Sequence, residues 1–186
     1  MNGYRIHTPA SAPEASRPSL QRLQQIFGAI PNLAATMAES PTLLDGFVGA
    51  LVNFASGTFT SGERQVLLLT NAVTNGCTWA VAFHSTMAMK EGIPRAEIEA
   101  VREGRLPDDR RLAALSSLTR ALIERRGHLD PGHLAAFRDA GFAADQTLEV
   151  IAGVACSVMA NHAGNITQPT LEPRFEPQAW EPGLRP

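Results

Sequence analysis

Three side chains within residues 60–84 are of types that commonly take part in catalysis. Glu63 supplies a carboxylate, Cys77 a thiol and His84 an imidazole. Cys77, Ala80 and His84 follow one another at the spacing i, i+3 and i+7, which puts them on one face of a helix over roughly 10.5 Å. A thiol beside an imidazole and a carboxylate is the arrangement of a proton relay into a nucleophile.

Two helices in a hairpin are expected to position these groups. Thr60 and Glu63 form the capping-box pattern that begins a helix over about 61–74, and Asn75-Gly76 ends it. Cys77 then falls in the first turn of a second helix, over about 77–91. Unpaired backbone N–H groups at such a helix start favour thiolate over thiol.

The hairpin also brings Glu63 toward His84. If the two helices fold back on each other at Asn75-Gly76, Glu63 comes level with about residue 88, one turn beyond His84. We therefore expect the carboxylate to reach the imidazole directly or through a water molecule.

Each of the three residues has a structural interpretation as well. Free cysteines are among the most buried residue types, so Cys77 is also a candidate core residue. His84 lies on a helix that carries bulky aromatic side chains. Glu63 is the capping-box residue of its own helix, and a capping role competes with a catalytic one.

The spacing of these residues resembles that of the alkylhydroperoxidase D (AhpD-like) and carboxymuconolactone decarboxylase family. In its peroxidase branch a Glu precedes Cys-x-x-Cys-x-x-x-His, the second Cys attacks the peroxide and the first resolves the disulfide. Here Glu63, Cys77 and His84 match the motif, but Ala80 stands at the second Cys. The resemblance covers most of the chain and implies an all-α, multihelical fold and homo-oligomers, either trimers or hexamers.

The departure at Ala80 changes the chemistry that the resemblance implies. Without a second sulfur two residues after it, Cys77 cannot form the local disulfide of a Cys-x-x-Cys peroxidase. A single thiol that reduces a small hydroperoxide and is restored by an external thiol reductant is the first interpretation. Catalytic residues would be Cys77, His84 and Glu63.

Two other interpretations stay open. The first is a lyase or isomerase of the carboxymuconolactone decarboxylase type, in which Glu63 and His84 move protons on a small organic substrate and Cys77 only shapes the pocket. The second is a non-catalytic redox sensor that kept the fold.

The rest of the chain predicts an all-helical bundle. Apolar residues recur at helical spacing and no strand alternation is found, which indicates eight or so helices. Besides the hairpin, helices are expected at about 18–27, 41–55, 95–103, 110–126, 131–140 and 144–162. Cys156, in the last of these, is interpreted as core, and His162 near its end as a residue placed by the helix dipole.

The two ends of the chain have a different composition from the bundle. Residues 1–17 are rich in Pro, Ser and Ala and predict an extended arm, and 18–164 form one domain. Residues 165–186 predict an extended tail, because prolines alternate there with large apolar residues such as Phe175 and Trp180. Such a tail should dock, either around a neighbouring subunit or on its own chain.

Composition limits the partners and cofactors. The net charge is -2, from 16 basic and 18 acidic residues without a long run of either sign, so neither nucleic acid nor an anionic membrane is an expected partner. No flavin, nicotinamide or phosphate-loop fingerprint is found, and Cys77, His84 and His162 are spaced poorly for a metal site. No cofactor or metal is expected. Two separated cysteines and the absence of a signal peptide or membrane span predict a cytoplasmic protein.

Overall fold

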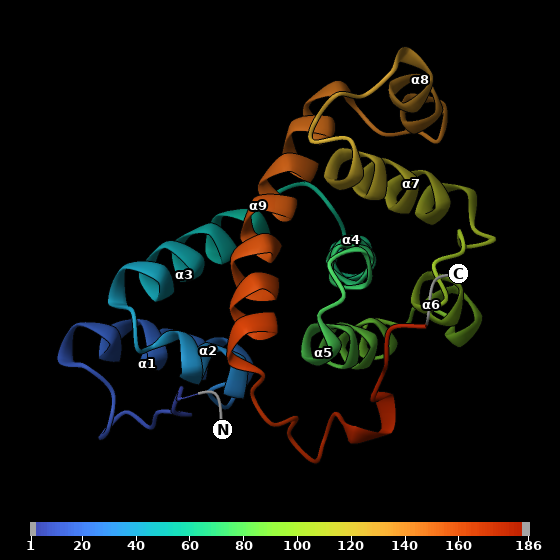
Figure 1. Cartoon of the computed structure of the whole chain (residues 1–186). Coiled ribbons are helices and arrows are strands. Elements are labelled where there is room, and N and C mark those ends of the chain that lie inside the picture. Colours follow the sequence, from blue (N-terminus) through green and yellow to red (C-terminus); the bar gives the residue numbers. More distant parts are fainter. Residues whose placement is uncertain (1–2, 184–186) are drawn as a thin grey trace.

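A computed structural model describes residues 3–183 of the chain. Within them all regular structure is helical, as the resemblance implied (Figure 1). The α-helices are α1 (Arg17–Phe27), α2 (Asn32–Met37), α3 (Pro41–Ala55), α4 (Ser61–Thr74), α5 (Thr78–Lys90), α6 (Arg95–Arg102), α7 (Arg110–Glu124), α8 (Pro131–Asp139) and α9 (Ala144–Thr167). Two short 3-10 helices, η1 (Glu14–Ser16) and η2 (Glu176–Gln178), lie near the ends.

The central hairpin forms as the sequence predicted. Helix α4 begins after the capping box of Thr60 and Glu63, and Gly76 takes the left-handed conformation, with φ of 65°, that turns the chain into α5. Helix α4 is buried along most of its length and contacts α5, α6, α7 and α9. It is therefore the element against which the others are placed.

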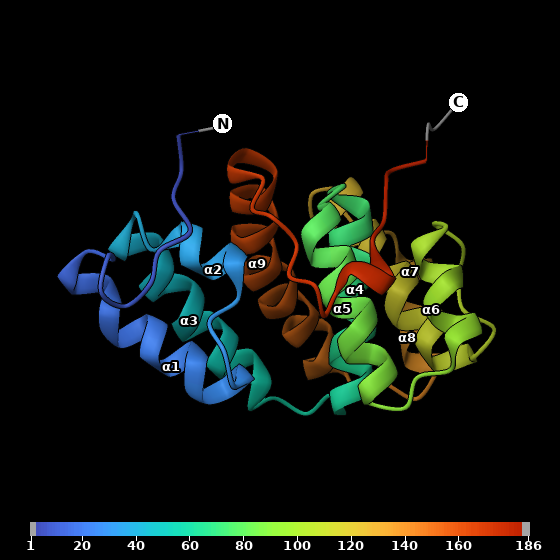
Figure 2. The ribbon, with the colours of Figure 1, turned by 90° about the horizontal axis from the view of Figure 1, so that it is seen from below.

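Helix α9 runs through the molecule between two groups of helices. Figure 2 shows α1, α2 and α3 on one side of it and α4 to α8 on the other. The helix continues to Thr167, five residues beyond the expected end at His162. It stops where Gln168 adopts a left-handed conformation, φ 44°, in front of Pro169, which cannot continue a helix.

The C-terminal tail docks on its own chain, which is the second of the two positions considered. In both views it passes along α5 toward α6 (Figures 1 and 2). Phe175 is 1% exposed and packs edge-on against Trp79 and Phe83 of α5, with ring centroids 6.0 and 5.2 Å apart. Glu172 accepts hydrogen bonds from the Trp79 indole N–H and the Asn32 backbone N–H, at 2.9 and 2.8 Å.

The N-terminal arm is held by one buried histidine. Residues 3–13 contain no helix, as predicted, but η1 begins at Glu14, inside the segment expected to be extended. Within that arm His7 is 7% exposed, its Nε2 lies 2.7 Å from the Glu39 carboxylate and its backbone N–H donates to the Ala35 carbonyl oxygen. Residues 1–2 of the predicted arm lie outside the described residues.

The surface of α9 bears on two further predictions. No single described helix has the length and apolarity to cross a membrane. Helices α8 and α9 together meet both criteria, but they are bent by 109° relative to each other.

Three large apolar side chains are exposed on α9: Leu148, Ile151 and Ile166 are 67%, 47% and 61% exposed. That face would suit a second subunit, and the homo-oligomer stays a prediction.

We expect the docked tail to contribute measurably to stability. Replacing Phe175 by Ala removes a fully buried ring, so the free energy of unfolding in urea should fall by about 3 kcal/mol. Glu181→Ala, an exposed change in the same tail, serves as the control and should leave the midpoint unchanged. Equal midpoints for Phe175→Ala and the control would show that the tail is not bound to α5 in solution.

Candidate functional site

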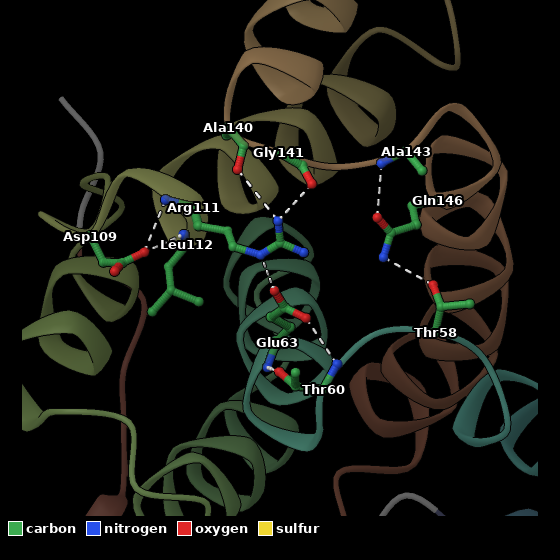
Figure 3. A network of polar contacts seen from close by, with 10 residues as sticks. All are labelled: Thr58, Thr60, Glu63, Asp109, Arg111, Leu112, Ala140, Gly141, Ala143 and Gln146. Carbon is green, nitrogen blue, oxygen red and sulfur yellow. Dashed lines mark hydrogen bonds and ion pairs between the residues drawn. The ribbon is translucent and has the colours of Figure 1, made fainter.

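Glu63 is engaged on both carboxylate oxygens by structural partners. Oε2 accepts from the Thr60 backbone N–H at 2.8 Å, and the Thr60 hydroxyl oxygen accepts from the Glu63 N–H at 3.2 Å, which completes the capping box. Oε1 accepts from Nε of Arg111 at 2.5 Å (Figure 3). The side chain is 6% exposed. A catalytic Glu63 would have to give up one of these bonds.

Arg111 extends this network to a third part of the chain. It lies in the first turn of α7, and its Nη1 donates to the Gly141 carbonyl oxygen at 2.9 Å. Its guanidinium stacks over the Phe142 ring, 3.7 Å from the centroid. Figure 3 shows the guanidinium between α4 and the α8–α9 connection. The Glu63–Arg111 ion pair thus fixes three helices at one end of the bundle.

Cys77 is a buried residue at the start of α5. It occupies the N-cap position and is 1% exposed. Its sulfur lies against Gly164 of α9, where an added Cβ would come within 2.8 Å of Sγ. Burial raises the pKa of the thiol, and the N–H groups of Ala80 and Trp79, which act in the opposite direction, only partly offset this. The backbone N–H groups at the start of α5 lower the pKa of the thiol as expected, but desolvation raises it by more.

His84 is paired with Gln65 of α4. Nδ1 lies 2.9 Å from Oε1 of Gln65. Because a carbonyl oxygen can only accept, Nδ1 carries the ring proton and Nε2 keeps its lone pair. Burial lowers the pKa of His84 to about 3, so the ring is neutral at physiological pH. Among the described residues Glu63 and His84 make no hydrogen bond to each other, and each is bound to a different partner.

An apolar cavity of about 50 Å³ lies beside His84. Helix α5 contributes Trp79, Ala80, Phe83 and His84 to its wall, and α9 contributes Cys156, Ser157 and Ala160. Side chains of α1, α2, α3, α4 and the α1–α2 connection complete it: Leu23, Phe27, Pro31, Leu33, Ala34, Phe47, Leu51 and Leu68. Of the three residues singled out in the sequence, His84 alone is among these lining residues.

Sequence reasoning missed the partner of His84 and the second wall of the cavity. The hairpin register placed Glu63 one turn beyond His84, and Gln65, two residues later, was the nearer polar side chain. Cys156 was interpreted as core, and it is 1% exposed, but it also lines the cavity. Burial raises its pKa to about 12. Nothing in the local sequence of α9 signals that Cys156 and Ser157 face α5.

The remaining candidates lie apart from this site. His162 is exposed on α9 and does not line the cavity. Among the described residues no three His, Cys, Asp or Glu side chains come together as metal ligands would.

Part of this chain matches the model of a known protein family. Residues 38–109 match the carboxymuconolactone decarboxylase family. The matched segment contains Glu63, Gln65, Cys77 and His84, and ends before α9. A search of curated proteins finds no significant match.

Solved structures share the fold. An alkylhydroperoxidase AhpD core protein, described as an uncharacterized peroxidase-related protein from Ralstonia eutropha JMP134, superposes with a TM-score of 0.79 over 92% of this chain and 93% of that chain, at 19% identity. The debrominase Bmp8 in its apo form gives 0.76 over 93% and 94%, at 19% identity. A cysteine-to-alanine variant of Bmp8, solved with 2,3,4-tribromopyrrole, gives 0.77 over 95% of each chain, at 18% identity. These likenesses confirm the expected fold.

The contacts of Glu63 lead to a prediction about stability. Glu63→Gln keeps the length of the side chain but leaves Arg111 without its anion, so the free energy of unfolding should fall by roughly 2 kcal/mol. In a double-mutant cycle with Arg111→Ala, much of this loss should disappear. Glu103→Gln, which breaks the exposed pair with Arg105, is the matched control and should change stability little. A Glu63→Gln protein of unchanged stability would contradict the structural role.

The environment of His84 leads to a prediction about titration. By nuclear magnetic resonance, the ring should stay neutral from pH 8 down to about pH 4, because its pKa is near 3. The unfolded chain takes up a proton on this residue near pH 6.5 and the folded chain does not, so His84 makes stability fall as the pH drops from 6.5 toward 3.

Substitutions at Gln65 test the cause of this titration. Gln65→Glu should raise the pKa of His84 by roughly one unit or more, because a carboxylate stabilises the imidazolium. Gln65→Leu, which supplies neither a charge nor an acceptor, is the control and should not raise it. An ordinary His84 titration in the wild-type protein would show that the ring is solvated.

Proposed function

Because residues 38–109 carry the carboxymuconolactone decarboxylase family segment and the chain folds like AhpD core proteins, we propose that it is an enzyme acting on a small apolar organic molecule. The observation that carries the proposal is the neutral His84 imidazole, held by Gln65 at the wall of an apolar cavity. In this role Nε2 accepts a proton or a hydrogen bond from the substrate. The reaction is of the lyase or isomerase type.

The low pKa of His84 limits what the imidazole can do. A base whose conjugate acid has a pKa of about 3 removes a proton only from a group that is itself acidic in the site, and it returns that proton readily. Such a base suits transfer of a proton from one position of a substrate to another. Gln65 keeps the ring in the tautomer that this transfer needs, as an orienting partner does in hydrolase triads.

The size and lining of the cavity define the substrate class. A space of about 50 Å³ holds only a few heavy atoms, so a ring enters only if lining side chains move. Phe27, Phe47 and Leu51 are half-buried and are the lining residues with room to do so. Trp79 and Phe83, stacked at 5.1 Å, offer a flat apolar surface to a planar molecule.

The debrominase neighbour suggests a chemical probe. Its variant was solved with a halogenated pyrrole, a flat ring with one acidic N–H. The same two features, a planar apolar body and one donor, are those that the Trp79–Phe83 surface and His84 Nε2 would bind. Pyrrole is a small molecule that has both.

Peroxide reduction by Cys77 is the other activity that the family resemblance implies, and the geometry supports it less. Attack on a peroxide requires an accessible thiolate, whereas Cys77 is 1% exposed, its pKa is raised and it does not line the cavity. The family position of the attacking sulfur is Ala80, which does line the cavity.

A binding experiment tests the role of His84. We expect the wild-type protein to bind pyrrole roughly fivefold more tightly than 1-methylpyrrole, which lacks the N–H, because one hydrogen bond to His84 is lost. Titration followed by nuclear magnetic resonance measures both affinities. His84→Phe should remove the preference, and Cys77→Ser, whose side chain lies outside the cavity wall, should keep it. Equal affinities in the wild-type protein would refute the proposal.

A second experiment decides between the two activities. The reduced protein is exposed for seconds to one equivalent of an organic hydroperoxide in the presence of a sulfenic-acid trap, and both cysteines are followed by mass spectrometry. Slow and similar modification of Cys77 and Cys156 is expected from their burial. Rapid trapping of Cys77 alone, lost in His84→Ala, would instead establish the peroxidase.

A further inference from the structure

Ser157 is a second polar group in the wall of the cavity. It lies on α9, outside the segment that matches the family, and is 3% exposed. Most of the wall is apolar, so the few polar atoms in it determine which molecule fits. The indole N–H of Trp79 is used by Glu172, so apart from His84 the polar side chains available in the lining are Ser157 and the weakly polar Cys156.

A chain of buried amides fixes the direction of the hydrogen bonds at Ser157. Nδ2 of Asn75 donates to the backbone carbonyl oxygen of Asn71 at 2.9 Å and to Asn71 Oδ1 at 2.7 Å. Because a backbone carbonyl can only accept, this contact settles the orientation of the Asn75 amide and, through it, of Asn71. Asn161 must then turn its Nδ2 toward Asn71 Oδ1, at 2.8 Å, and the same Nδ2 donates to the Ser157 oxygen at 3.2 Å.

The hydroxyl proton of Ser157 is consequently free to be donated to a molecule in the cavity. Two buried helical threonines, Thr70 and Thr119, donate theirs to the backbone carbonyl oxygen four residues earlier, at 2.8 Å in each case. Ser157 makes no such bond among the described residues; its one contact is as the acceptor from Asn161. This hydroxyl can therefore donate to an acceptor that enters the cavity.

We infer that Ser157 binds the substrate by donating a hydrogen bond to a neutral carbonyl-type oxygen. This rests on the proposed function and specifies its substrate class: a small molecule with both an acidic X–H for His84 and a carbonyl oxygen for Ser157. A carboxylate is not favoured there, because no Lys or Arg lines the cavity to neutralise it.

The two contacts act on the same proton transfer. A carbonyl group acidifies the adjacent C–H, and a hydrogen bond from Ser157 to its oxygen strengthens that effect. As His84 Nε2 takes the proton, the C–H electron pair forms a C=C bond and the C=O pair moves to the oxygen that Ser157 holds. Return of the proton to another carbon completes an isomerisation, without oxidant or reductant.

Acetylpyrroles test this inference against pyrrole. We expect the wild-type protein to bind 2-acetylpyrrole or 3-acetylpyrrole roughly tenfold more tightly than pyrrole. Ser157→Ala should reduce this gain to about twofold and leave pyrrole binding unchanged. Ser116→Ala is the matched control, because Ser116 is also buried in a helix and shares one side-chain hydrogen bond, with Thr70, but does not line the cavity. It should leave both affinities unchanged.

An infrared measurement separates binding from a structural role. The carbonyl stretch of the isotope-labelled ketone should lie at lower frequency in the wild-type complex than in the Ser157→Ala complex, and Ser157→Thr should restore it. If Ser157→Ala weakens pyrrole and ketone alike without moving this band, the inference is overturned while the role of His84 stands. If pyrrole and 1-methylpyrrole bind the wild-type protein equally, the proposed function fails and the inference with it.

Discussion

The ion pair between Glu63 and Arg111 is the constraint on which the arrangement of the helices depends. A carboxylate that is almost fully buried is tolerable only with its charge paired and its oxygens hydrogen-bonded, and Arg111 and the Thr60 N–H together meet this need. Arg111 in turn binds the Gly141 carbonyl, which fixes the connection from α8 into α9. The network thus anchors the N-terminal end of α9, the helix that forms one wall of the cavity.

This arrangement assigns different tasks to residues that the sequence presents as one group. Glu63 holds helices together, Cys77 fills the contact between α5 and Gly164, and His84 alone faces the cavity. Gln65 lies next to His84, in the position where the hairpin register predicted Glu63. The exchange has a chemical consequence, because an amide orients the imidazole without stabilising its protonated form.

The fold was predictable because it depends on local signals. The capping box at Thr60, the Asn75-Gly76 turn and the apolar spacing along each helix act over a few residues, and the central hairpin forms where they indicated. Contacts between distant segments were not predictable in this way. The pairing of Glu63 with Arg111 and the approach of Ser157 to α5 join residues far apart in sequence, so no spacing within one helix reports them. The end of α9 was placed too early because small residues such as Gly164 lie inside that helix, where they allow Cys77 to approach.

One physical cause connects the chemistry of the cavity. Burial away from water raises the pKa of Cys77 and Cys156 and lowers that of His84, so the neutral form is favoured in all three. A site that disfavours thiolate and imidazolium alike gives up a bound proton readily, so it favours a brief proton transfer over a long-lived charged intermediate. It suits a neutral substrate whose own polar groups are matched by one acceptor and one donor. The position of Ala80, a methyl group where the family resemblance implies a sulfur, agrees with that chemistry, since it leaves the cavity wall apolar beside the imidazole.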